Sequence, residues 1–149
     1  MSEIVLTEKE LKDLEEFNRL QRILLVTTGT LQGTLCAYFG VPISVQVVSQ
    51  EECNSVHFFR KTNLICKETV VCRATSDIVV FDPNIRDLIR EQKYGLGQIL
   101  RMAGVRPSFR FKETGQDDST FWRSYELQAP GVLYQIKEEF PKELYDGLA

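Results

Sequence analysis

Apolar residues in the first forty positions recur at helical spacing. Thr7 and Glu10 form the signature of a capping box, with a hydroxyl at the N-cap and a carboxylate three residues later. The apolar residues that follow predict a short amphipathic helix, and they are Leu11, Leu14 and Phe17. A second helical stretch is predicted around 20–26. Gly29 breaks this pattern, and Thr30 is expected to cap a third helix that ends at Gly40.

After Pro42 the hydrophobic period changes from helical to alternating. Three strands are predicted, at 43–47, 56–66 and 69–80. Asp82 and Pro83 indicate a helix start, with an N-cap followed by proline at the first helical position. This helical pattern is interrupted around 94–97 and resumes as far as Gly104. Three further strands are predicted, at 107–112, 121–127 and 131–140.

The order of these elements predicts the fold class. Successive strands are joined by short turns, which only antiparallel pairing permits. We therefore expect a single α+β domain over 1–149, with one roughly six-stranded antiparallel sheet and helices packed on one side. We find no internal repeat, linker or low-complexity segment.

Composition narrows the classes of partner. The net charge is −3, so the chain has no overall bias toward nucleic acid or an anionic membrane. Its longest apolar run, 23–26, is far shorter than a membrane span. Residues 1–5 precede an acidic segment, which is not typical of a signal peptide, so we expect a cytoplasmic protein. The sequence leaves the oligomeric state open.

The cysteine and histidine content argues against a metal site. None of the four cysteines forms a Cys-x-x-Cys pair, and His57 is the single histidine, so we expect no metal and no cofactor. Spacing does not exclude a Cys–His catalytic pair, but small buried thiols are the commoner case. If a turn centres on Thr69, Cys66 and Cys72 lie opposite each other across a hairpin, close to disulfide distance.

Charged residues interrupt otherwise apolar strands, and these are the candidates for chemistry: Arg60, Arg73, Arg110, Arg123 and Glu138. An arginine on a buried sheet face needs a partner, and an anionic ligand is one possibility. The alternative is that these side chains lie on a solvated face. For Glu138, strand parity favours the inner face, because Ile136 and Phe140 share it. Adjacent Glu139 leaves a second register open.

Four segments in this order resemble the chorismate pyruvate-lyase family, especially its shorter archaeal and actinobacterial branch. The similarity runs from about Arg22 to Pro141. The segments are Gly29-Thr30-Leu31-Gln32 with the strand after Gly40, Phe58-Phe59-Arg60, Leu96-Gly97, and Glu138-Glu139-Phe140 ahead of a proline. They are similar to the family's first flap, its aromatic-apolar-Arg motif, its second flap and its active-site glutamate segment.

The resemblance implies a cofactor-free lyase that converts chorismate to 4-hydroxybenzoate and pyruvate. It implies Glu138 and Arg60 as catalytic residues, with Arg60 clamping the substrate carboxylate. Leu31, Leu96 and Gly97 would contact the substrate from the two flaps. Arg73 is the candidate for the family's further arginine, although the turn after Arg60 differs in length.

Two alternatives remain. The same fold resembles the effector-binding domains of some GntR-type transcription regulators, so the chain could be a non-catalytic module that binds an aromatic or anionic effector. A lyase of this fold could also act on a different anionic enol ether, because fold does not determine substrate.

Overall fold

The computed structural model describes residues 6–28 and 31–146. The chain begins with three helices, α1 (Glu8–Asp13), α2 (Arg19–Val26) and α3 (Leu31–Phe39), and a three-stranded meander, β1 (Ile43–Asn54), β2 (His57–Cys66) and β3 (Thr69–Val80). Two helices follow, α4 (Pro83–Glu91) and α5 (Leu96–Met102). A second meander, β4 (Ser108–Gln116), β5 (Thr120–Ala129) and β6 (Val132–Pro141), precedes the 3-10 helix η1 (Lys142–Leu144).

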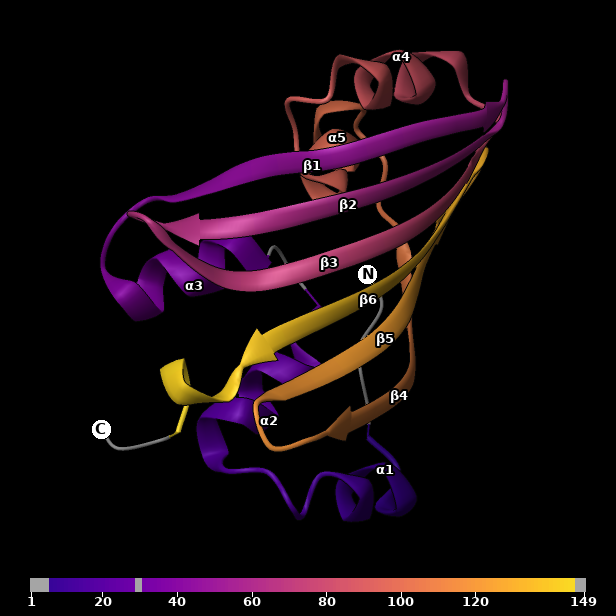
Figure 1. Ribbon diagram of the computed structural model, residues 1–149. Coiled ribbons are helices and arrows are strands. Elements are labelled where there is room, and N and C mark those ends of the chain that lie inside the picture. The colour runs from indigo at the N-terminus through magenta and orange to yellow at the C-terminus, as the bar shows by residue number, and fades with distance from the viewer. Residues whose placement is uncertain (1–5, 29–30, 147–149) are drawn as a thin grey trace.

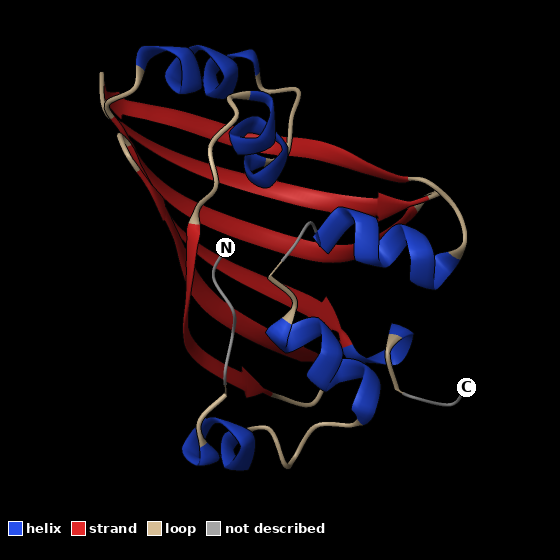
Figure 2. Cartoon of the chain, turned by 180° about the vertical axis from the view of Figure 1, so that it is seen from behind, coloured by secondary structure: helices blue, strands red, loops and turns tan. Residues whose placement is uncertain are grey.

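All six strands form one antiparallel sheet in the order β1-β2-β3-β6-β5-β4. Helices α2 to α5 lie on the same face of this sheet, behind it in Figure 1 and in front of it in Figure 2. The predicted α+β class, with helices on one side of a six-stranded sheet, is confirmed. No helix among the described residues is long and apolar enough to cross a membrane.

Local signals placed most helix starts correctly. The capping box at Thr7 and Glu10 is present, but α1 ends at Asp13, earlier than the sequence pattern suggested. Asp82 caps α4, and its carboxylate accepts hydrogen bonds from the amides of Asn84 and Ile85. The predicted break at Gly29 and cap at Thr30 fall outside the described residues.

The hairpin between β2 and β3 corrects the expected pairing of two cysteines. The turn lies at Lys67 and Glu68, where Lys67 adopts a positive φ of 58°, and is not centred on Thr69. Cys66 therefore pairs with Thr69, and Cys72 pairs with Leu64. The two thiols are not cross-strand neighbours, and both are free cysteines.

After α1, the chain consists of two halves with the same order of elements. Each half has two helices followed by a three-stranded meander, α2-α3-β1-β2-β3 and α4-α5-β4-β5-β6. The halves meet at the antiparallel β3–β6 pair in the centre of the sheet, so an approximate two-fold axis passes through the sheet there. Helices α3 and α5 are each followed by a glycine with positive φ, Gly40 and Gly104.

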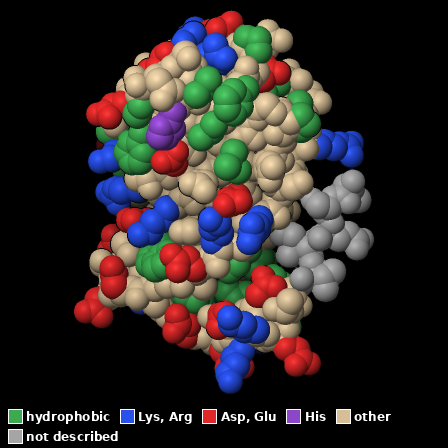
Figure 3. Space-filling model, turned by 90° about the vertical axis from the view of Figure 1, so that its right-hand side faces the viewer, with side chains coloured by type: hydrophobic (Ala, Val, Ile, Leu, Met, Phe, Trp, Pro, Cys, Tyr) green, Lys and Arg blue, Asp and Glu red, His purple; other side chains and the backbone are tan. Residues whose placement is uncertain are grey.

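The outer face of the sheet is open and mixed in charge. His57 Nε2 and Asp77 Oδ1 are joined there by a hydrogen bond of 2.7 Å. Lysine, arginine and acidic side chains are interspersed over the face shown in Figure 3. The apolar cores therefore lie between the sheet and the helices, on the other side.

Candidate functional site

A cavity of about 110 Å³ lies between the inner face of the sheet and the helices. All six strands contribute to its wall, and residues 28, 31–32 and 95–98 border it from the helical side. The lining is mainly apolar, with a few polar groups from the central strands. A cavity of about 150 Å³ lined by apolar side chains can hold benzene, so this one has the size of a single ring.

Glu138 is the acidic residue of the cavity wall. Glu138 is only 6% exposed. Its two carboxylate oxygens have different hydrogen-bond partners. Arg123 Nε donates to Glu138 Oε1 at 2.7 Å, and the Tyr125 hydroxyl donates to Glu138 Oε2 at 2.7 Å. A carboxylate can accept about four hydrogen bonds, so Glu138 retains capacity for a ligand hydroxyl.

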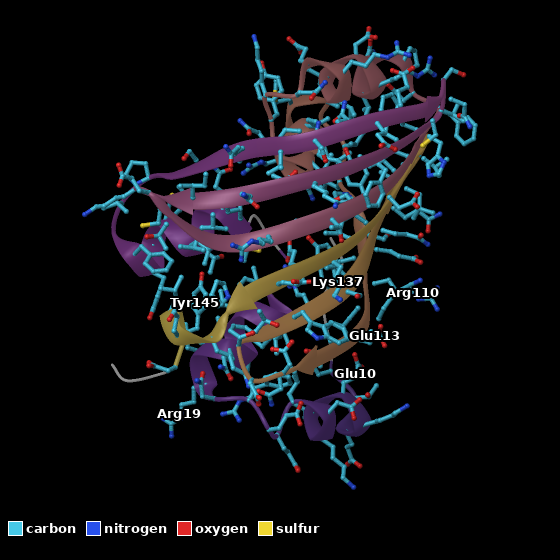
Figure 4. The ribbon with its side chains drawn as sticks, in the orientation of Figure 1. Glu10, Arg19, Arg110, Glu113, Lys137 and Tyr145 are labelled. Atoms are coloured by element: carbon cyan, nitrogen blue, oxygen red, sulfur yellow. The ribbon has the colours of Figure 1, made fainter. Side chains whose placement is uncertain are left out.

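The strand register settles which glutamate faces inward. Glu138 shares the inner face with Ile136 and Phe140, as parity predicted. Its neighbour Lys137, labelled in Figure 4, belongs to the outer face, where its ammonium lies 4.6 Å from the centre of the Trp122 ring. Glu139 lies beside Lys137, 3.5 Å from its Nζ, and does not border the cavity.

Arg123 connects this carboxylate to the end of α2. Its Nη1 donates to the carbonyls of Leu25 and Thr27, at 3.2 and 2.6 Å, at the C-terminal end of α2. Burial lowers the pKa of the Arg123 guanidinium, but the charge of Glu138, together with Tyr125 and Cys72, holds that pKa above its usual value. Arg123 and Glu138 therefore form a charged pair within the cavity wall.

An aromatic wall completes this end of the cavity. The rings of Phe109 and Tyr125 are stacked, with centroids 4.8 Å apart, and the Arg123 guanidinium lies 4.5 Å from the Tyr125 centroid. Burial, and then the charge of Glu138, raises the pKa of the Tyr125 phenol well above its usual value. Tyr125 is therefore a hydrogen-bond donor to Glu138 across the physiological pH range.

Arg60 lies on the inner face of β2 but does not border the cavity. Its Nε donates to Gln50 Oε1 at 2.8 Å, its Nη1 to the Tyr94 carbonyl at 2.7 Å, and its Nη2 to the Ile89 carbonyl at 3.0 Å. Burial lowers the pKa of Arg60 to about 10, so the guanidinium is charged at neutral pH. It holds the end of α4 and the residue before Gly95.

The structure brings together four of the six expected site residues. Glu138, Leu31, Leu96 and Gly97 all border the cavity. Arg60 does not border the cavity with Glu138, and its guanidinium bonds to Gln50 and to the carbonyls of Ile89 and Tyr94. Arg73 is exposed, because its strand parity places it opposite to Cys72 and Ala74, on the outer face.

Arg123 and Tyr125 are site residues that the sequence analysis did not select. Arg123 was noted as one of several strand arginines, and Tyr125 was not considered. The same parity argument that selected Glu138 applies to them, because alternate residues of β5 face inward, and these are Phe121, Arg123, Tyr125 and Leu127. A second signal was the pair of short matches Phe58-Phe59-Arg60 and Phe121-Trp122-Arg123.

Among the described residues, no group of three or more histidine, cysteine, aspartate or glutamate side chains could hold a metal ion. The described polar side chains that border the cavity include those of Glu138, Arg123 and Tyr125. The α5 N-cap, Gly95, provides no side-chain cap for the first amides of that helix, which border the cavity. No protein-family model matches this chain, and no curated protein matches it.

Proposed function

We propose that the cavity binds a single-ring carboxylic acid, and that the protein is a cofactor-free lyase converting chorismate to 4-hydroxybenzoate and pyruvate. One observation carries the proposal. A buried glutamate, held by a guanidinium and a phenol, borders a ring-sized apolar cavity between two flaps. The reaction comes from the resemblance to chorismate pyruvate-lyases, whose expected glutamate and flap residues are those of this cavity.

For this reaction the protein must chiefly orient the substrate and exclude water from the site. The ether bond between the ring and the enolpyruvyl group breaks, and its electron pair leaves with the enolpyruvyl oxygen. The ring carbon that bears the hydroxyl loses a proton, and the released enol takes up a proton as it becomes pyruvate. The ring becomes aromatic, which supplies the driving force.

In this scheme Glu138 accepts a hydrogen bond from the ring hydroxyl. Tyr125 and Arg123 fix its orientation, because each holds one of its oxygens. The flaps at Leu31 and at Leu96-Gly97 close over the ring. Because the cavity of about 110 Å³ matches an unsubstituted ring, the flaps must move outward to admit the substituents of chorismate, and product release can limit the rate.

The direct test is incubation of the purified protein with chorismate, with 4-hydroxybenzoate and pyruvate followed by absorbance and a coupled assay. Equimolar appearance of both products is expected. Spontaneous decay of chorismate in buffer, and in the presence of Glu138→Gln, provides the baseline. A folded protein that does not exceed this baseline would reject the lyase.

A non-catalytic effector-binding module is the second candidate, and one observation favours it. Arg123 and Tyr125 already hold the two oxygens of Glu138, so this carboxylate is arranged to accept a hydrogen bond from a bound ligand. Tight binding of 4-hydroxybenzoate without chorismate turnover would support this candidate. A lyase acting on another anionic enol ether would show neither chorismate turnover nor preference for 4-hydroxybenzoate.

A further inference from the structure

The cavity has a second polar end that comes from the repeat in the fold. Arg60 pairs across the strands with Ser76, just as Arg123 pairs with Glu138, so Ser76 is the counterpart of Glu138 in the other half. By the same register Thr62, two residues after Arg60, is the counterpart of Tyr125, two residues after Arg123. Ser76, Glu138, Thr62 and Tyr125 all border the cavity.

The two ends differ in how their polar groups are satisfied. Tyr125 and Glu138 bond to each other, whereas no hydrogen bond joins the hydroxyl of Ser76 or Thr62 to another side chain or carbonyl of the described residues. Ser76 is only 3% exposed and Thr62 is half-buried. Both residues border the cavity, so their hydroxyls are available to a ligand oxygen or ordered water.

The charges around the cavity indicate which ligand group belongs at this end. At the aromatic end the carboxylate of Glu138 already neutralises Arg123, so no unpaired cation there attracts the acid group of a ligand. The cross-strand neighbour of Ser76 is Arg60, a buried cation whose three hydrogen-bond partners are all neutral. Arg60 forms no ion pair with a described carboxylate. A buried charge without a counter-ion is costly, so this end of the cavity favours an anion.

We propose that the hydroxyls of Ser76 and Thr62 form a carboxylate subsite, which binds the acid group of the ring ligand while Glu138 receives its hydroxyl. Arg60, the cross-strand neighbour of Ser76, attracts the acid group through its charge and does not contact the ligand. This subsite deepens the proposed function and rests on the ring-acid cavity. It assigns the ligand one orientation, with its acid toward β2 and β3 and its hydroxyl toward β6.

The test measures the binding of three probes to the wild-type protein and to matched variants. Benzoate carries only the acid, phenol only the hydroxyl, and 4-hydroxybenzoate both. Ser76→Ala and Thr62→Val remove one hydroxyl each, while Thr62→Ser retains the hydroxyl and loses the methyl group. Ser124→Ala, on the outer face of β5, is the control for loss of a strand hydroxyl. Dissociation constants are measured by ligand-observed NMR at neutral pH, with folding checked by circular dichroism.

Ser76→Ala and Thr62→Val should each weaken benzoate and 4-hydroxybenzoate by about tenfold, as expected for a hydrogen bond to a charged group, and change phenol by less than about twofold. Thr62→Ser and Ser124→Ala should bind all three probes like the wild-type protein. Equal losses for benzoate and phenol, no loss for benzoate, or a wild-type protein that binds no benzoate at millimolar concentration would overturn the subsite.

The result separates the subsite from the lyase. If benzoate binding depends on both hydroxyls but chorismate is not converted, the subsite stands and the lyase is rejected. If chorismate is converted while Ser76→Ala and Thr62→Val leave benzoate binding unchanged, the lyase stands and the subsite is rejected.

Discussion

The two halves of the molecule use the same buried arginine in different ways. Arg60 and Arg123 each occupy the fourth position of the middle strand of a meander, and each donates to two carbonyls near a flap of the other half. Arg123 also has a carboxylate partner, whereas Arg60 has the amide oxygen of Gln50. One arginine is thus neutralised within the fold, and the other keeps its charge available to a ligand.

This difference shows how a repeated architecture can produce a polarised cavity. Two identical halves would give a cavity with equivalent ends, unable to orient an asymmetric ligand. Replacing one acidic counterpart with Ser76 and one phenol with Thr62 gives the ends different chemistry, while both arginines continue to hold the flaps. The following predictions test that contrast.

The largest expected effect is on stability, in Arg123→Met. This change leaves Glu138 buried without its counter-ion and removes the donor to two carbonyls of the first flap, so the free energy of unfolding should fall by about 3–5 kcal/mol. Arg60→Met removes hydrogen bonds to neutral groups only and also removes an unpaired buried charge. Its loss should be smaller, about 1–3 kcal/mol. Urea denaturation measures the free energy of unfolding of both variants. A loss in Arg60→Met equal to or greater than that in Arg123→Met would contradict the difference between the two arginines.

Glu138→Gln should affect turnover most among the isosteric changes. The amide keeps the shape of the side chain but is a poorer acceptor for the ring hydroxyl, so chorismate conversion should fall by about 100-fold or more. The matched change Glu139→Gln, on the outer face, should leave kcat and KM unchanged. Steady-state kinetics decide this, and similar rates for both variants would remove Glu138 from the mechanism.

The two buried tyrosines near the arginines provide a smaller test. Tyr125→Phe removes the donor to Glu138 and should cost about 1–2 kcal/mol of stability. Tyr134, which faces Arg60, has a buried hydroxyl with no hydrogen-bond partner. Tyr134→Phe should therefore be neutral or slightly stabilising. Thermal denaturation of the pair checks this, and a larger loss in Tyr134→Phe would show that its hydroxyl is satisfied in solution.

Alkaline titration should give the smallest effect. The pKa of Tyr125 is raised by burial and by Glu138, so above about pH 10 the unfolded chain releases this proton while the folded protein keeps it. Below pH 10 the contribution of Tyr125 to the free energy of unfolding is fully present. Above pH 10 this contribution falls by at most about 1.4 kcal/mol per pH unit. Tyr125→Phe should show a shallower loss between pH 10 and 11 in urea titrations. An unchanged slope would mean that Tyr125 ionises normally.

Most of the fold could be predicted from the sequence, because it depends on local signals. Alternation and short turns indicate antiparallel strands, and Asp82-Pro83 indicates a helix start whatever surrounds them. Parity placed Glu138 on the inner face because its apolar neighbours Ile136 and Phe140 are adjacent in sequence. The inner position of Arg60 follows from the same rule.

The site was harder to predict, because it depends on distant contacts. Whether Arg60 reaches a ligand depends on the carbonyls of Ile89 and Tyr94, some thirty residues away, which occupy its guanidinium. Arg73 was expected to contact the substrate, but parity within β3 places it on the outer face, since its neighbour Cys72 is buried. The equivalence of Ser76 with Glu138 depends on the pairing of β2 with β3 and of β5 with β6, which no short motif encodes.

Helix α2 has a consequence for biosynthesis. Although it forms early in the chain, both of its ends are held by late residues, since the Asn18 side chain donates to the carbonyl of Tyr145, 127 positions away, and Arg123 binds the Leu25 carbonyl, 98 positions away. Contacts so distant in sequence form late and slow the overall rate of folding. Helix α2 therefore gains these two contacts only after residues as late in the sequence as Arg123 and Tyr145 have been synthesised.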